Sequence, residues 1–353
     1  MPVIDADTHI DETEDTWAYL EGAAVGFRPV TEPLPAPIPG DARPHLVWRI
    51  GNHLRLRRWR DDKRTGTTRE TRELLDVEAR LRHMDKLGVD IHVIYPTMFL
   101  SPATPDPEVE VALCRSYNRW LAEATSPGRG RLRWVAVVPM CNIDSAAREL
   151  SFARDHGACG VLKRGLEYDR KASDPYFFPL YEEAERLNLP ICVHTGGGGN
   201  GSFSEVTNLP PFPPIGNLSV LAAFSALVLD GVPKKFPRLR FGFIEAGASW
   251  IPYLITDLKA KSKRQTALGF DMTADLLRAY RLYVTADTID DLPYLLRWGT
   301  EDSLLLGTDY SHADQSAELE AFEILRRRAA TGEIAEELVE KVLNENPRRF
   351  YGL

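Results

Sequence analysis

Short apolar runs alternate with amphipathic segments along almost the whole chain, and this alternation restricts the possible folds more than any other feature of the sequence. The runs with strand character span residues 3–7, 89–95, 132–138, 160–163, 189–194, 239–245, 282–285 and 303–309. In the segment 76–87, Val77, Leu81 and Met84 recur at helical spacing. Strands that alternate with helices are typically parallel and joined by right-handed crossovers. Eight such units predict an α/β fold, a closed (β/α)8 barrel of the TIM type.

Composition agrees with one large soluble domain. The chain has 353 residues, of which 44% are hydrophobic and 27% charged, so we predict a single barrel domain over residues 1–353. Its four cysteines form no C-x-x-C pair and are predicted to be core residues in a reducing compartment. No signal peptide is visible, and the longest apolar run, 218–229, is too short to span a bilayer. We therefore expect a cytoplasmic protein without membrane contacts.

Two insertions interrupt the repeat, and both are expected on the catalytic face of the barrel. The first, 22–72, is basic, because its part from 43 to 72 holds ten Lys or Arg against three Asp or Glu. The whole chain carries a net charge of −8, which argues against nucleic-acid binding. The basic patch predicts an anionic substrate, bound by Arg55, Arg57 and Arg58, and a solvated basic face is the open alternative. The second insertion, 195–217, is rich in Gly and Pro and is predicted to be a lid loop.

Ionisable residues close several predicted strands, where parallel barrels carry their active sites. Asp7 and His9 lie two residues apart on the first strand, so their side chains point the same way. His194 closes the fifth strand and Asp309 the eighth. Charged groups at the ends of apolar strands are costly without a partner, and a shared metal ion would satisfy them together. Each residue alone has a structural alternative, as a helix cap or a hydrogen-bonded core histidine.

The number of donors favours more than one ion. The candidate metal ligands are four carboxylates and two imidazoles: Asp7, His9, Glu12, His194, Glu245 and Asp309. One Zn²⁺ takes about four ligands, whereas mixed carboxylate and imidazole sets suit iron or manganese pairs. We therefore predict a divalent metal, with two Fe ions as the first choice and Zn or Mn as alternatives. Glu245 and Asp309 are also candidate catalytic bases, and two alternatives stay open: Glu12 could point into solvent, and Glu245 could orient a ligand.

Two further residues stay open between metal or substrate binding and a structural role. Lys163 closes the fourth strand, where the alternative is an ion pair with a carboxylate or an anionic substrate. His312 follows Asp309 by three residues in a predicted loop, where the alternative is a surface position. Neither residue is assigned by its spacing alone.

Several motifs are similar to those of a known family. They are D-x-H in the first strand, PICVH in the fifth, GTDYSH in the eighth, and the segments MDKLGVDIHVIYPT, LRFGFIEAGASW and NENPRRFYGL. Together they resemble the amidohydrolase superfamily (amidohydrolase family 2), in the branch of aminocarboxymuconate-semialdehyde decarboxylase. The resemblance covers essentially the full chain and implies metal ligation by Asp7, His9, His194 and Asp309.

Two positions depart from the pattern of that family. Asp7 stands where the family has the first histidine of H-x-H, and Glu245 stands where it has a strand-six histidine that serves as general acid or base. At the position of Lys163, some dinuclear members of the superfamily carry a carboxylated lysine that bridges two metals. The missing strand-six histidine makes simple decarboxylation a weaker prediction than oxidation.

We therefore predict an oxygen-dependent monooxygenase. The sequence is similar to the barrel-fold non-haem di-iron monooxygenases of bacterial diterpenoid (platensimycin and platencin) biosynthesis. This resemblance implies hydroxylation of an unactivated C–H bond in a coenzyme A-linked substrate, with O2 and an external reductant, and with the basic patch at the coenzyme's phosphates. The alternatives are metal-dependent hydrolysis of an amide, ester or lactone, and nonoxidative decarboxylation of an aromatic or dienoic acid. Relatives in this branch are often homodimers, and 218–229 is expected either at such a contact or in the core.

Overall fold

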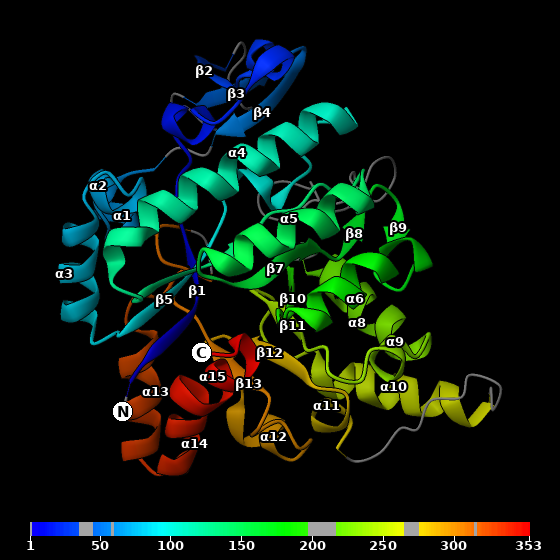
Figure 1. The fold of residues 1–353 in the computed structure, drawn as a ribbon. Helices are drawn as coiled ribbons and strands as arrows, with labels where there is room; N and C mark the ends of the chain where they lie inside the picture. Colours follow the sequence, from blue (N-terminus) through cyan, green and yellow to red (C-terminus); the bar gives the residue numbers. More distant parts are fainter. Residues whose placement is uncertain (1, 35–44, 58–59, 197–216, 265–274, 314–315) are drawn as a thin grey trace.

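Eight parallel strands form the central sheet, in the order β1-β5-β6-β7-β10-β11-β12-β13. The structure, a computed structural model, describes residues 2–34, 45–57, 60–196, 217–264, 275–313 and 316–353. The strand bounds are β1 Ile4–His9, β5 Ile91–Tyr95, β6 Leu132–Ala136, β7 Ala158–Arg164, β10 Ile191–His194, β11 Phe241–Ile244, β12 Leu282–Ala286 and β13 Leu304–Leu306. Each coincides with one of the eight predicted runs, and helices surround the sheet (Figure 1). The predicted α/β barrel is confirmed.

The barrel closes where β1 meets β13. Thr8 forms a parallel bridge to Tyr310, the backbone N–H of His9 donates to the Tyr310 carbonyl at 2.9 Å, and that of Asp309 donates to the Asp7 carbonyl at 2.9 Å. A glycine permits this approach, because a Cβ atom at Gly307 would lie 2.4 Å from the Cβ of Asp7. The closure places the carboxyl ends of the first and last strands side by side.

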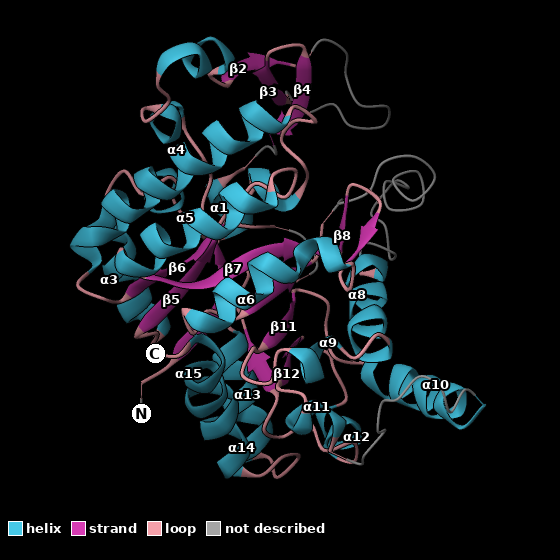
Figure 2. Cartoon of the chain, turned by 45° about the vertical axis from the view of Figure 1, so that its right-hand side comes forward, coloured by secondary structure: helices cyan, strands magenta, loops and turns pink. Residues whose placement is uncertain are grey.

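Helices cover the outside of the barrel (Figure 2). The longer ones are α3 Val77–Leu87, α4 Pro107–Thr125, α5 Ile143–Asp155, α6 Phe178–Arg186, α8 Leu218–Leu229, α10 Ile251–Arg264 and α13 Ala321–Ala330. The shorter ones are α1 Asp62–Thr65, α2 Arg69–Arg72, α9 Val232–Lys235, α11 Leu276–Ala279, α12 Leu292–Leu296, α14 Glu336–Glu340 and α15 Asn346–Tyr351. In α3, the Asp76 carboxylate accepts from the Ala79 N–H, and Gly88 ends the helix at φ 67°.

The insertion after β1 forms a small sheet of its own. Strands β2 Val30–Pro33, β3 Leu46–Ile50 and β4 His53–Arg57 pair antiparallel in that order, and both views place them beside α4 (Figures 1 and 2). The buried Trp48 ring meets the buried Trp17 ring edge-on at 6.1 Å between centroids. This contact fixes the small sheet to the segment that follows β1. Most of the predicted lid 195–217 lies outside the described residues. Arg58 also lies outside them.

Short elements complete the connections. They are the two-stranded ribbon of β8 Leu166–Glu167 and β9 Arg170–Lys171, the 3₁₀ turns η1 Glu14–Trp17, η2 Gly22–Phe27, η3 Met98–Leu100, η4 Ser126–Gly128 and η5 Pro175–Phe177, and the π-helical turn η7 Lys341–Glu345. Helix α8 belongs to the core, because the buried Phe224 ring lies 5.1 Å from the ring of Phe243 on β11. Among the described residues, no helix combines the length and apolar character that crossing a bilayer requires.

Candidate metal centre

Asp7 and His9 project from the end of β1 into a buried site. Asp7 is 2% exposed and His9 is fully buried. The pairing of β1 with β5 shifts register between Asp5 and Thr8, so the strand end that carries these two side chains is irregular. The Asp7 Oδ1 atom and the His9 Nε2 atom are 3.4 Å apart.

The two buried histidines are held in the orientation that metal ligands need. Nδ1 of His9 lies 2.9 Å from the Pro96 carbonyl oxygen, and Nδ1 of His194, at the end of β10, lies 2.8 Å from the Thr195 carbonyl oxygen. Because a carbonyl can only accept, both Nδ1 atoms carry the proton in the neutral rings. The lone pair of each Nε2 then faces the site, as metal-bound histidines require. Both Nε2 atoms are buried and make no hydrogen bond within the described part of the chain.

Glu245 and Asp309 reach the same site from turns after β11 and β13. Both residues adopt left-handed backbone angles, with φ 54° and 51°, which side chains other than glycine seldom adopt and which often mark functional sites. The Thr285 hydroxyl accepts the Glu245 N–H at 2.7 Å. Glu245 Oε2 lies 3.3 Å from His194 Nε2, and Asp309 Oδ1 lies 3.4 Å from His9 Nε2.

His312 completes the site. Its Nδ1 lies 2.7 Å from Asp309 Oδ1, its Nε2 lies 3.2 Å from the Thr97 hydroxyl, and its ring stacks on His9 at 3.9 Å between centroids. It is 1% exposed, so the surface alternative for His312 is wrong. Residues 96 and 97 directly after β5, which orient His9 and His312, carry no chemical signal in the sequence beyond their place at a strand end.

Two overlapping groups of donors could each hold an ion. One consists of Asp7, His9, His194 and Glu245, the other of His9, Glu245, Asp309 and His312, and in each the ligand atoms lie within 4.8 Å of one another. Donors held about 2.1 Å from one ion in a tetrahedron are roughly 3.4 Å apart. The observed contacts of 3.3 Å and 3.4 Å match that spacing. The residues therefore fit a divalent cation.

The charges of the buried site also favour a cation. Burial opposes the ionised carboxylate of Asp7, yet the positive charge of His194 and the adjacent His9 ring lower the pKa of Asp7 to about 2. Burial likewise opposes a charged His194, but Asp7 and Glu245 raise the pKa of His194 to about 9. The metal-free site thus holds a proton where its carboxylates need positive charge. A divalent ion would replace that proton and neutralise the carboxylates together.

A comparison with known protein families matches a model described as amidohydrolase over residues 4–353. The chain belongs to the amidohydrolase family. Among curated relatives, 2-amino-3-carboxymuconate-6-semialdehyde decarboxylase of Dictyostelium discoideum is 24% identical over 293 residues, which cover 79% of this chain and 77% of that protein. Gamma-resorcylate decarboxylase of Polaromonas sp. is 28% identical over 129 residues, covering 34% of this chain and 40% of that protein.

Solved structures share the amidohydrolase fold. An amidohydrolase from Mycobacterium avium subsp. paratuberculosis superposes with a TM-score of 0.78 at 19% identity, covering 100% of this chain and 98% of that chain. The 5-carboxyvanillate decarboxylase of Novosphingobium aromaticivorans, complexed with manganese, gives a TM-score of 0.65 at 18% identity, covering 81% of this chain and 82% of that chain. The expected family is thus confirmed, whereas the finer resemblance to di-iron monooxygenases gains no support from these relatives.

The structure leaves Glu12 outside both donor groups of the amidohydrolase site. Its buried carboxylate accepts hydrogen bonds from the backbone N–H groups of Thr97 and Met98 at 3.0 Å. Burial raises the pKa of Glu12 to about 7. Glu12 therefore fixes the turn after β5 that orients His9 and His312, and the other five predicted ligands are the ones that converge.

Lys163 faces away from the donors. In the pairing of β7 with β10, His194 is opposite Arg164 and Lys163 is opposite Val193, so Lys163 lies on the other face of the sheet from His194. The buried Lys163 Nζ sits 3.7 Å from the centroid of the Phe177 ring and 3.9 Å from Glu167 Oε1. The geometry agrees with the ion-pair alternative and not with a carboxylated bridging lysine.

We expect the substitution Lys163→Met to change how stability depends on pH. Burial lowers the pKa of Lys163 from 10.5 to about 8, so between these values the unfolded chain binds the proton more tightly. The free energy of unfolding of the parent should therefore rise with pH across this window, by up to about 3 kcal/mol. Urea unfolding at pH 7 to 10.5 should give the variant a higher free energy of unfolding than the parent at pH 7. The difference between the two free energies should shrink as pH rises. Lys171→Met, at an exposed lysine, is the control, and parallel curves for parent and Lys163→Met would contradict the prediction.

Two of the three predicted substrate arginines, Arg55 and Arg57, lie in the described part of the basic insertion. Arg57 donates to the Thr31 hydroxyl at 2.9 Å and lies 4.7 Å from the centre of the Trp48 ring, so it stabilises the small sheet. Arg55 is half-buried and donates to the Ala103 carbonyl at 3.2 Å. Arg58 lies outside the described residues, and substrate binding by the three arginines stays a prediction.

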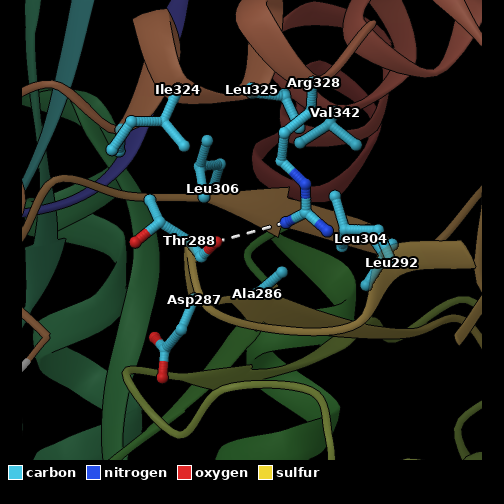
Figure 3. Close-up of a pocket in the computed structure, with 11 residues that line it drawn as sticks. Ala286, Asp287, Thr288, Leu292, Leu304, Leu306, Ile324, Leu325, Arg328 and Val342 are labelled. Atoms are coloured by element: carbon cyan, nitrogen blue, oxygen red, sulfur yellow. Dashed lines mark hydrogen bonds between the residues drawn. The ribbon is translucent and has the colours of Figure 1, made fainter. Parts of the chain in front are cut away.

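A small pocket lies apart from the metal donors, between β12, β13 and α13. Figure 3 shows its mainly apolar lining, with Leu304, Leu306 and Ile324 around it and Arg328 donating to the Thr288 carbonyl at 3.2 Å. None of the described lining residues belongs to either donor group. The pocket is therefore separate from the candidate metal centre.

Proposed function

We propose that this protein is a divalent-metal-dependent decarboxylase that removes CO2, without oxidation, from a hydroxylated aromatic or dienoic acid. The observation that carries the proposal is the buried group of Asp7, His9 and His194, in which backbone carbonyls turn both histidine lone pairs toward one carboxylate. The curated relatives described above are decarboxylases of carboxylated dienes and hydroxybenzoates, and one solved relative is a decarboxylase complexed with manganese. This reaction replaces the monooxygenation that the sequence first favours.

The residues that would hold the ion are Asp7, His9 and His194 of the first donor group. Asp309, whose Oδ1 lies 3.4 Å from His9 Nε2, would be a further donor, and Glu245 would be left to carry the proton. When bound, a divalent cation supplies Lewis-acid chemistry, in that it holds the carboxylate and neighbouring hydroxyl of the substrate and stabilises developing negative charge. The surrounding chain excludes water from these donors, since Asp7, His9, His194 and Asp309 are at most 2% exposed.

Glu245 is the residue placed to handle the proton. Decarboxylation breaks the bond between the ring or diene carbon and the carboxylate carbon, CO2 leaves, and the electron pair stays on the former carbon, which then needs a proton. Glu245 occupies the strand-six position at which the family's acid or base is expected, and its Oε2 faces the site beside His194. A proton held on the Glu245 carboxyl group would be delivered to that carbon.

The test is an anaerobic assay of metal-loaded protein. Metal-free protein is reconstituted with Mn²⁺ or Zn²⁺ and incubated with gamma-resorcylate, 5-carboxyvanillate and 2-amino-3-carboxymuconate-6-semialdehyde. We expect metal-dependent release of CO2 in the absence of O2, with one equivalent of the decarboxylated product. Absence of CO2 from all three acid classes, together with reductant-dependent O2 consumption, would overturn the proposal.

A second candidate is a dinuclear, oxygen-activating centre, and one observation favours it. The group of His9, Glu245, Asp309 and His312 shares His9 and Glu245 with the first group, and carboxylates that lie between two sites suit paired iron or manganese ions. Two Fe ions would then support C–H hydroxylation with O2 and a reductant, and a coenzyme A-linked substrate would contact Arg55. Elemental analysis of protein expressed with iron and zinc both present separates the candidates, since two Fe ions per chain support the second and one Mn or Zn ion supports the first.

A further inference from the structure

We propose that Ser316 is a positioning residue that orients the carboxylates of Glu245 and Asp309 at the metal site. Its hydroxyl lies 2.9 Å from Glu245 Oε1 and 3.1 Å from Asp309 Oδ2. One side chain from the segment after β13 thus links two candidate ligands that belong to different strands. The inference rests on the metal-dependent function proposed above, but its test measures metal binding directly.

The contacts of Ser316 divide the four carboxylate oxygens into two pairs. The oxygens that touch the hydroxyl are Glu245 Oε1 and Asp309 Oδ2. The other two face the ring nitrogens, with Glu245 Oε2 3.3 Å from His194 Nε2 and Asp309 Oδ1 3.4 Å from His9 Nε2. Ser316 therefore favours metal binding through Asp309 Oδ1 alone and keeps Glu245 Oε2 turned toward His194.

The two carboxylates need such a link because of the backbone positions that carry them. Glu245 and Asp309 both extend from left-handed turns, so their side chains are not held by the regular pleat of a strand. The hydroxyl of Ser316 carries one proton and donates to one of the two carboxylate oxygens at a time. Two carboxylates drawn to one hydroxyl are costly to bring together unless a cation lies near the oxygens that face the histidine nitrogens. This arrangement of two carboxylates around one hydroxyl is therefore the one expected when a cation is bound.

The backbone directly after Ser316 is fixed independently of the metal. The Glu318 N–H donates to the Thr308 carbonyl at 3.0 Å. This bond ties the chain that follows the serine to the end of the eighth barrel strand. Removing the hydroxyl should therefore loosen the two carboxylates and leave the fold in place.

The test compares Ser316→Thr with Ser316→Val, two variants of the same shape that differ by the hydroxyl. The dissociation constant for Mn²⁺ is measured by competition with a chelator, and thermal unfolding of the metal-free proteins is recorded alongside. We expect Ser316→Val and Ser316→Ala to bind Mn²⁺ about 10–100-fold more weakly than the parent, as for other partners of metal ligands, and Ser316→Thr to bind as the parent does. Ser225→Ala, which removes a hydroxyl bonded to a helix carbonyl in α8, should change nothing.

The outcomes separate this inference from the proposed function. Equal Mn²⁺ affinity in the Thr and Val variants would overturn the role of Ser316 while leaving the metal-dependent decarboxylase intact. A parent protein that binds no divalent metal would overturn both. Weakened binding in the Val variant with no decarboxylase activity in the parent would support Ser316 and refute the reaction.

Discussion

His194→Ala should lose its metal ion and at least about 10³-fold of its kcat/KM for decarboxylation. His194 Nε2 lies 3.4 Å from Asp7 Oδ1 and 3.3 Å from Glu245 Oε2, so the ring stands between two carboxylates. Without it, the ion loses a neutral nitrogen donor and the two buried carboxylates repel each other without compensation. Loss of the Lewis acid removes several kcal/mol of charge stabilisation from the transition state.

Metal content and turnover are the two measurements for His194→Ala. Elemental analysis gives ions per chain after dialysis, and CO2 release is followed with saturating Mn²⁺ present. His156→Ala is the matched control, because this exposed histidine at the end of α5 lies outside both donor groups, and it should retain both metal and activity. Full metal content in His194→Ala would show that the ion is held by the second donor group and would remove His194 from the proposed mechanism.

The donors on regular strands could be predicted from sequence because their geometry is periodic. Asp7 and His9 are two residues apart, and a strand that alternates its faces places both on one side. His194 closes an apolar run that can only be a buried strand, and the barrel topology brings its end to the same rim as the end of β1. The positions of these residues could be predicted without knowing any loop conformation, and the structure brings their side chains together as predicted.

Sequence could not predict where some side chains point. These are the side chains whose orientation depends on the exact pairing register of two strands or on the conformation of a turn. Lys163 and Arg164 are neighbours at one strand end, and the pairing with β10 alone decides that Lys163 faces Phe177. Glu12 follows β1 closely enough to reach the site, yet its carboxylate accepts hydrogen bonds from backbone N–H groups in the turn after β5 instead.

Ser316 shows a different kind of gap between sequence and structure. It lies 71 residues from Glu245 in the chain, and an isolated serine in a polar segment has no pattern that predicts such a contact. The barrel brings the two together only because its strands converge at one rim. The candidate ligands on the strands could thus be inferred from sequence, whereas the serine that contacts Glu245 and Asp309 could be found only in the structure.

Glu245→Gln should lower the kcat for decarboxylation by about 10²–10⁴-fold and leave the metal content unchanged. The amide keeps the size of the side chain and a hydrogen bond to Ser316, but it cannot carry the proton that the product carbon needs. Because Asp7, His9, His194 and Asp309 still offer four donors, the ion should remain. The measurements are CO2 release under saturating substrate and ions per chain.

Glu245→His places at this position the residue type that the family resemblance leads one to expect, and it separates the two candidate functions. In a decarboxylase the imidazole can hold and deliver the proton, so this variant should recover more activity than Glu245→Gln and keep one ion. In a dinuclear centre Glu245 belongs to both donor groups, so either substitution should displace an ion and abolish O2 consumption. A fall from two ions to one in Glu245→Gln would therefore identify Glu245 as a ligand shared by two metals and would rule it out as the proton donor. Unchanged metal with lost turnover would identify it as the acid that protonates the product.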